Sequence, residues 1–244
     1  MTSSSILKMP FLAIELSQRT GGVALAGENI DPVVLPVTGG RREKDELLPA
    51  VRQVLDSAGV AVRDLESVAV DIGPGGFTGL RISIAAGQML AEVAGATIVG
   101  IPGAEVAAAS TSTVFGGTRT GTILVVSATR NGTAWTTRLS RDDPDRDWRS
   151  VGEGMLAGAP PEEGFDTVLA DEHLDPSWRS RFESLGIEIV EPDHSAQGLI
   201  GLLRRSTSGP PPASWHVSDD PATLRPIYPR EPEAVRLWKA KSGR

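Results

Sequence analysis

The chain is 244 residues long, and 40% of them are hydrophobic while 23% carry a charge. This ordinary globular balance allows a buried core without a structural metal, and the absence of cysteine excludes disulfides, thiolate zinc sites and cysteine nucleophiles. The formal net charge of −7 argues against autonomous nucleic-acid binding, because affinity for phosphates comes mainly from Lys and Arg.

The N-terminal part predicts a three-stranded antiparallel meander followed by a helix. Short apolar runs with tight connections lie at 11–16, 23–26 and 33–37. Such runs are typical of strands joined by hairpins. In the predicted helix at 45–58, Leu47, Val51 and Val54 recur at helical spacing. Asp45 is the expected N-cap of this helix, and Gly59 is its expected stop.

The next elements predict a βαβ unit. A strand at 68–72 leads into a glycine-rich loop, and Thr78 is the expected cap of a helix that runs to residue 94. A second strand follows at 97–101, and a further helix at 105–110. Strands separated by one helix in this way usually pair in parallel.

The second half repeats the mixture of strands and helices without a fixed period. Glycines around 116–121 suggest a hinge, and Asn131-Gly132 between two β-rich runs predicts a hairpin. The polar segment 142–164 predicts a loop. The remaining expected elements are strands at 122–126, 133–139, 167–170 and 187–190, helices at 178–185 and 196–206, and a short helix near 234–239.

We therefore expect an α/β fold with two subdomains of mixed sheet and helices. The expected division is an N-terminal subdomain at 1–112, a smaller α/β subdomain at 113–208 and a Pro-rich C-terminal tail at 209–244. No apolar run reaches the length of a membrane span or of the core of a signal peptide. A cytoplasmic protein without membrane contact is the expectation.

The most specific pattern in the chain is the loop between the strand at 68–72 and the helix after it. Its residues are Gly73, Pro74, Gly75, Gly76, Phe77, Thr78, Gly79 and Arg81. A helix N-terminus beside an arginine suits an anion. The loop nevertheless lacks the lysine of a phosphate-binding P-loop, and its glycines do not follow the dinucleotide pattern. We favour a tight strand-to-helix turn that lets the helix pack closely.

The helix that follows this loop is apolar on more than one face. Its polar residues form one narrow stripe, made of Arg81, Gln88 and Glu92. A helix that covers a sheet needs only one apolar stripe, so apolar surface remains for another contact. Burial under the neighbouring helix is an even alternative to docking of a partner. The candidate partner-binding residues are Leu47, Val51, Val54, Leu80, Ile82, Ala85, Ala86 and Met89.

Other candidate sites lack the patterns that chemistry requires. The three histidines have no metal-binding spacing, and no serine lies in a nucleophile motif. Glu15 and Ser17 could be the remnant of a phosphate-binding hairpin, but an ordinary turn is favoured. The acidic run that ends at Asp147 lacks the glycine and distal glutamate of a calcium loop, so a solvated loop is expected. We predict no catalytic residue and no metal site.

Three segments together resemble the TsaB (YeaZ) family. The stretch 71–82 is similar to the family signature GPGSFTGLRIG, with Gly76 in the position of the serine. The stretches 12–17 and 22–25 are similar to the family's opening AIDTS and SVAL, and 226–230 to its PxYxR tail. Leu47-Leu48-Pro49 stands where the family begins a helix. The resemblance covers residues 1–100 well and the middle of the chain poorly.

The resemblance implies the ASKHA fold of actin, Hsp70 and sugar kinases, which is related to RNase H. It also implies a role as a non-catalytic scaffold subunit. The partners would be the catalytic paralogue TsaD and the ATPase TsaE, which together modify adenosine 37 of tRNAs that read ANN codons. Contact with tRNA would occur only through the complex. No cofactor is expected for the chain alone. Nucleotide at the junction with TsaD, and a homodimer of the isolated chain, are left open.

The sequence departs from the family pattern at three places. Glu15 stands where the family has Asp, Glu43 where a His is common, and Ser127 begins the stretch where the family reads DAR. These changes bear on ligand chemistry more than on the fold. Two other functions therefore stay open: a divergent small-molecule kinase or acyltransferase of the ASKHA class, and a self-associating degenerate homologue.

Overall fold

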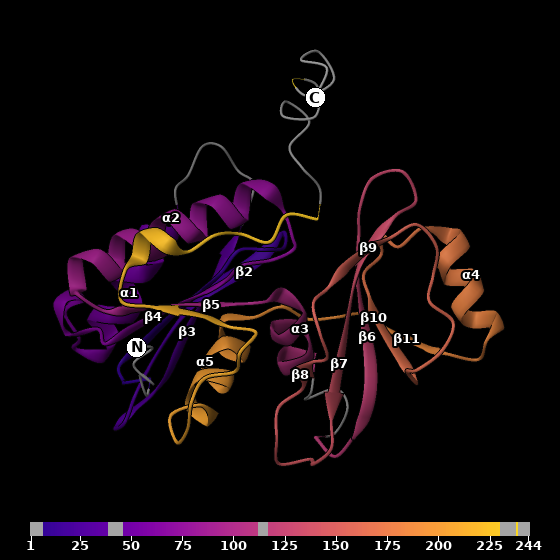
Figure 1. The fold of residues 1–244 in the computed structure, drawn as a ribbon. Coiled ribbons are helices and arrows are strands. Elements are labelled where there is room, and N and C mark those ends of the chain that lie inside the picture. Colours follow the sequence, from indigo (N-terminus) through magenta and orange to yellow (C-terminus); the bar gives the residue numbers. More distant parts are fainter. Residues whose placement is uncertain (1–6, 39–45, 112–116, 230–237, 239–244) are drawn as a thin grey trace.

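The computed structural model describes residues 7–38, 46–111, 117–229 and 238, and these form two lobes, each built on one mixed sheet (Figure 1). The strand order is β12-β5-β4-β1-β2-β3 in the first sheet. In the second it is β11-β10-β6-β7-β8, with β9 also paired to β7. The chain is thus an α/β protein with two sheets and helices on their faces, as the sequence predicts.

The first sheet contains the predicted meander and the predicted βαβ unit. Its strands are β1 (Phe11–Glu15), β2 (Thr20–Gly27), β3 (Ile30–Thr38), β4 (Ser67–Asp71), β5 (Thr97–Ile101) and β12 (His216–Ser218). β1, β2 and β3 pair antiparallel, whereas β4 lies parallel to both β1 and β5. Every residue of β1 and β4 is buried, because helices cover both faces of the sheet.

Four helices cover the first sheet, two on each face. α1 (Leu47–Ala58) and α2 (Phe77–Ala94) share a core with side chains of one face, including Leu12 and Val68. α5 (Ala196–Arg205) packs on the opposite face. α3 (Gly103–Thr111) contributes Val106 to that second core and Ala107 to the core of the other lobe. α3 therefore joins the two lobes.

The second sheet begins with the predicted hairpin. Its strands are β6 (Gly121–Ala128), β7 (Ala134–Arg141), β8 (Arg149–Ser150), β9 (Met155–Ala157), β10 (Thr167–Ala170) and β11 (Glu188–Val190), with α4 (Pro176–Ser184) on its outer face. β6 and β7 pair antiparallel around Asn131 and Gly132, which have φ values of 64° and 66°. Positive φ at both central residues is what this type of tight turn requires.

Two expectations for the second half need correction. The segment 142–164 is not a continuous loop, because β8 and β9 both pair with β7. The segment after residue 209 is also more than an extended tail, since β12 pairs antiparallel with β5 and the turn η2 (Pro221–Thr223) follows it. The helix near 196–206 is α5, which lies against the first sheet. The boundaries at 112 and 208 stay a prediction.

Some sequence-based expectations fall on positions that the structure does not describe. Asp45 and Glu43 lie outside the described residues, as does most of the predicted helix at 234–239. In the described part of the chain, Glu46 precedes α1 and Gly59 ends it in the left-handed conformation. Among the helices of the described residues, none is long and apolar enough to cross a membrane.

Candidate functional site

The glycine-rich loop at 72–76 is a tight turn that joins β4 to α2, and we call it the elbow. Gly76 donates a backbone hydrogen bond to Ser17 O over 2.6 Å, and Gly73 donates one to the Asp71 carboxylate over 2.6 Å. A Cβ atom on Gly79 would lie 1.9 Å from Leu16 O, and one on Gly75 would lie 2.6 Å from Ser17 O. The glycines thus let the elbow and the first turn of α2 touch the end of β1 backbone to backbone, as a tight turn requires.

The elbow begins α2 two residues earlier than the sequence indicated. Gly76 is the N-cap and provides no side-chain hydrogen bond, so the expected capping role of Thr78 is wrong. Thr78 lies in the first turn and is exposed. Because the loop is closed by backbone contacts with the β1 end, the helix start is fixed without a capping side chain.

One face of α2 packs on the sheet. Leu80, Ser83, Ile84, Gly87, Leu90 and Ala91 are its buried residues. A Cβ atom on Gly87 would lie 2.5 Å from a methyl group of Val70, so the small residue here serves contact with β4. Gly87 is therefore not part of a surface that another protein could approach.

The opposite face of α2 is apolar and exposed. Ile82 is 49% exposed, Met89 48% and Val93 67%, and Ala85 is exposed between them. These four residues follow one line along the helix, and we call Ile82, Ala85, Met89 and Val93 the α2 stripe. Phe77, which is 51% exposed, lies at the start of the helix on a different line.

The candidate partner-binding residues therefore divide into two groups. Ile82, Ala85 and Met89 belong to the α2 stripe, whereas Ala86 is half-buried and packs against the core. The other four are corrections: Leu47, Val51, Val54 and Leu80 are at most 4% exposed and lie in the core of this chain. The α1 residues face β2 and β3, which leaves Leu48, 42% exposed, as the large apolar side chain on the outside of that helix.

The predicted polar stripe of α2 contacts the C-terminal segment instead of facing solvent alone. Gln88 donates hydrogen bonds to Pro221 O and Leu224 O. Arg81 donates through Nε to the hydroxyl of Tyr228 over 3.1 Å, and its guanidinium lies 3.8 Å from the centre of the Phe77 ring. The PxYxR-like tail and the elbow motif are thus neighbours in space.

A pair of buried acids lies behind the elbow. The Glu15 carboxylate accepts hydrogen bonds from the amide and the hydroxyl of Ser17, at 2.6 and 2.5 Å. Burial raises the pKa of Glu15 to about 8, and the charge of Asp71 adds to the rise. Burial also raises the pKa of Asp71 to about 6, opposed by hydrogen bonds from Gly73 and Ser17. One oxygen of each carboxylate lacks a hydrogen-bond partner among the described residues.

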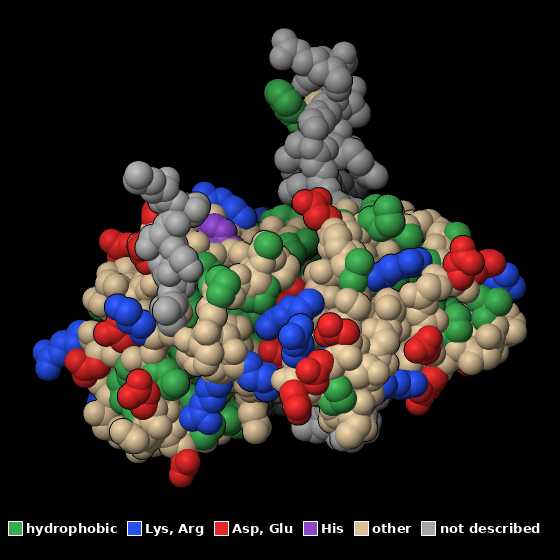
Figure 2. Space-filling view, turned by 60° about the horizontal axis from the view of Figure 1, so that its bottom comes forward, with side chains coloured by type: hydrophobic (Ala, Val, Ile, Leu, Met, Phe, Trp, Pro, Cys, Tyr) green, Lys and Arg blue, Asp and Glu red, His purple; other side chains and the backbone are tan. Residues whose placement is uncertain are grey.

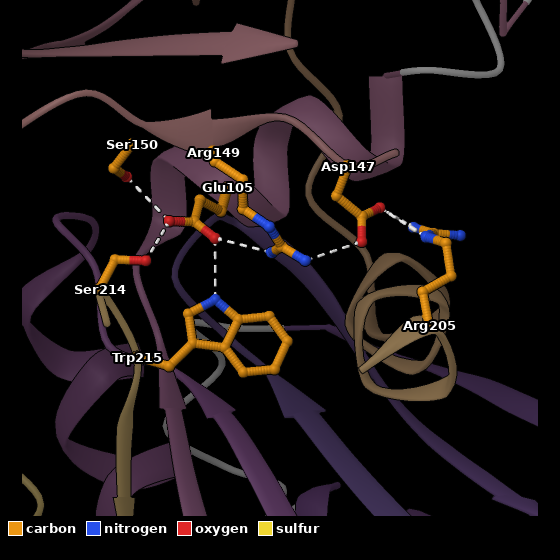
Figure 3. Close-up of polar contacts among 7 residues, drawn as sticks. All are labelled: Glu105, Asp147, Arg149, Ser150, Arg205, Ser214 and Trp215. Atoms are coloured by element: carbon orange, nitrogen blue, oxygen red, sulfur yellow. Dashed lines mark hydrogen bonds and ion pairs between the residues drawn. The ribbon is translucent and has the colours of Figure 1, made fainter. Parts of the chain in front are cut away.

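A second polar cluster, which no sequence pattern predicted, connects the lobes (Figure 3). Glu105 on α3 is fully buried and accepts hydrogen bonds from the hydroxyls of Ser150 and Ser214 and from the indole of Trp215, at 2.6–2.8 Å. Arg149 on β8 lies between Glu105 and Asp147 and pairs with both. Because its buried carboxylate accepts this many hydrogen bonds, Glu105 holds α3, β8 and the segment before β12 together.

The acidic run is correspondingly less solvated than expected. The Asp147 side chain is only 6% exposed, because it pairs with Arg149 and Arg205. These groups line an open pocket of about 780 Å³ between β7, β8 and α5, together with Arg141, Arg146, Asp142 and Asp145. Figure 2 shows basic and acidic side chains side by side in the middle of this face of the molecule. Within the described ranges, no group of three or more His, Asp or Glu side chains could hold a metal ion.

Comparison with known proteins connects this geometry to a family. The family model of TsaD, tRNA N6-adenosine threonylcarbamoyltransferase, matches residues 30–143. An uncharacterised protein of Mycobacterium tuberculosis is 28% identical over 198 residues, which are 81% of this chain and 79% of the relative. The Bacillus subtilis protein TsaB is 34% identical over 85 residues, covering 34% of this chain and 36% of that protein.

The solved structures most relevant here have the same fold. YeaZ from Pseudomonas aeruginosa superposes with a TM-score of 0.70 at 19% identity, covering 90% of this chain and all of that one. TsaB of Escherichia coli is 36% identical over 61 residues, a quarter of this chain. The two sheets with their covering helices and the elbow place the chain in the ASKHA class of α/β proteins. Within that class, its sequence is similar to TsaB proteins over about a quarter to a third of its length and to the TsaD family model over residues 30–143.

Proposed function

We propose that this chain is a non-catalytic subunit that binds a TsaD-type paralogue through the α2 stripe. The complex, with a TsaE-type ATPase, would add the threonylcarbamoyl group to adenosine 37 of tRNAs that read ANN codons. The pathway is inferred from the names of the TsaB and TsaD relatives. The TsaD-type partner would carry the reactive groups and most of the tRNA contact, which fits the net charge of −7.

The observation that carries this proposal is the second apolar face of α2. A helix that only covers its own sheet has polar residues on the outside. Here the outer side presents Ile82, Met89 and Val93, which are about half to two-thirds exposed. An apolar line of this kind on a surface supports a docking contact with another protein.

The kind of partner follows from the part of the chain that the TsaD model matches. Residues 30–143 include both α1 and α2. A TsaD-type protein is therefore expected to have an equivalent pair of helices after its own elbow. Two such pairs can face each other across an approximate two-fold axis, as in symmetric dimers. The same reasoning allows a homodimer of the isolated chain, in which a second copy takes the place of the paralogue.

Two features of the elbow support a scaffold role over a phosphate-binding one. The Gly73 and Gly76 amides, which a phosphate would need, are already bonded to Asp71 and Ser17. Burial raises the pKa of Glu15 behind the elbow to about 8, so this acid is mostly uncharged at neutral pH and attracts a cation weakly. No cofactor is proposed for the chain alone.

The test is binding of the purified TsaD-type paralogue, measured by calorimetry and size exclusion. Ala85 is exposed in the middle of the stripe, and Ala85→Arg places a charge there. Ala159→Arg is the matched control, because Ala159 is exposed on the other lobe. We expect the first change to weaken binding at least about tenfold, roughly 1.4 kcal/mol, and the control to bind like the wild type. Equal binding by both variants would remove the stripe from the interface.

A further inference from the structure

The segment after β12 lies along α2 and forms hydrogen bonds with it (Figure 1). We call residues 219–228 the strap. Leu224 is buried in the core beneath it, and Ile227 donates a backbone hydrogen bond to Ile72 O over 2.8 Å. Gln88 holds the strap from the helix side. The strap therefore has a fixed path that ends beside the elbow.

The end of the strap forms a three-residue stack with the first turns of α2. The rings of Phe77 and Tyr228 have centroids 5.7 Å apart, and the Arg81 guanidinium lies 3.8 Å from the first centroid and 6.0 Å from the second. Phe77 is 51% exposed, Arg81 is exposed and Tyr228 is half-buried. We call these three residues the clasp.

The clasp has the composition and rigidity of an interface anchor. Tyrosine and arginine are enriched among the residues that contribute most to protein binding. The strap already fixes Tyr228, and the ring contact already orients Arg81, so little conformational freedom remains to be lost on association. The clasp also lies on the same helix as the α2 stripe, because Phe77 and Arg81 belong to the first turns of α2.

The hydrogen-bond donors of the Arg81 guanidinium indicate which group of a partner should face them in an interface. Its Nε donates to Tyr228, and its terminal nitrogens have no hydrogen-bond partner among the described residues. An interface would remove these donors from water, and a guanidinium in that situation requires a carboxylate, which it can bind through two hydrogen bonds.

We propose that the clasp anchors one end of the paralogue on the α2 stripe. The partner surface that fits it is a helix with an apolar side chain against Phe77 and a carboxylate against Arg81. This inference rests on the proposed function, because it places the same partner on the same face. It adds the C-terminal strap to the docking surface, although the strap and the elbow are far apart in the sequence.

The single tyrosine of the chain provides a direct probe. Protein labelled with 3-fluorotyrosine gives one ¹⁹F resonance, from position 228. We expect this resonance to move when saturating TsaD-type paralogue is added, and we expect Arg81→Ala and Tyr228→Ala to weaken binding by about tenfold or more. Arg81→Lys, which keeps the charge but loses the planar fork, should fall between Arg81→Ala and the wild type. Arg146→Ala, an exposed arginine on the other lobe, is the control.

The outcomes separate this inference from the proposed function. Melting temperatures of all variants near that of the wild type show that the fold is intact. If the paralogue binds, Ala85→Arg weakens binding, and the clasp variants bind like the wild type with an unmoved resonance, the clasp proposal is wrong while the docking face stands. If the wild-type chain does not bind the paralogue at all, the proposed function fails as well.

Discussion

Glu15 and Asp71 end two neighbouring parallel strands, and both carboxylates are completely buried. The register pairs Ile14 with Val70, so that the two acids follow one residue later on adjacent strands. Glu15 supports Ser17, and Asp71 supports Gly73, on the two sides of the contact that closes the elbow. The acid pair therefore couples protonation to the stability of the element from which α2 begins.

This coupling predicts that the protein loses stability as the pH rises. Glu15 has a folded pKa of about 8 against an ordinary 4.5, and Asp71 one of about 6 against 3.8. In the window between the unfolded and folded values, the folded state holds more protons, so the free energy of unfolding falls with increasing pH. The loss begins near pH 4 and is complete above about pH 8. Urea titrations between pH 4 and 9 measure it.

The matched variants for this experiment are Glu15→Gln and Glu92→Gln. The first removes the titrating group and should flatten the upper part of the curve, between about pH 6 and 8. The second changes an exposed glutamate on α2 and should leave the shape as in the wild type. A wild-type stability that stays level or increases from pH 6 to 8 would contradict the buried-pair interpretation.

Adding a methyl group just after the elbow should destabilise the fold. In Gly79→Ala, the new Cβ would lie 1.9 Å from Leu16 O, a backbone atom that moves only if β1 moves. Overpacking of this kind costs about 1–3 kcal/mol or more. Gly209→Ala is the control, because no heavy atom lies within 4 Å of its added Cβ. Chemical denaturation gives both values, and equal stability of the two variants would show that the elbow is looser than described.

The Glu105 cluster between the two lobes is expected to contribute strongly to the stability of the fold. Glu105→Ala removes the acceptor of three side-chain hydrogen bonds and leaves Arg149 without one of its partners (Figure 3). Breaking a buried pair in this way costs about 3–5 kcal/mol. Glu188→Ala, which breaks the exposed pair with Arg119, should cost about 1 kcal/mol or less. Thermal unfolding of the two variants tests this, and similar losses would refute the special role of Glu105.

The sequence predicted those features that depend on local patterns. The meander, the βαβ unit and the hairpin at Asn131-Gly132 follow from periodicity and turn chemistry, and they were confirmed. β8 and β9 were missed because they are only two and three residues long and form through pairing with β7. Short strands of this kind depend on tertiary contacts rather than on their own propensity.

The sequence alone did not predict which face of α2 packs on the sheet. Leu80 and Ile82 are both apolar, and helical spacing alone does not say which of them meets the sheet. Contact with β4 decides it, because the sheet-facing line passes through Gly87, where Val70 leaves no room for a side chain. The Glu105 cluster was missed for a related reason: its partners Ser150 and Ser214 come from distant segments, and no local pattern marks a buried glutamate.

The most direct test of the central claim is the level of threonylcarbamoyladenosine in cellular tRNA, measured by mass spectrometry of nucleosides after depletion of this chain. The docking account predicts that the level falls, that wild-type chain and Ala159→Arg restore it, and that Ala85→Arg at equal abundance does not. An unchanged level after depletion, or full restoration by Ala85→Arg, would contradict the account.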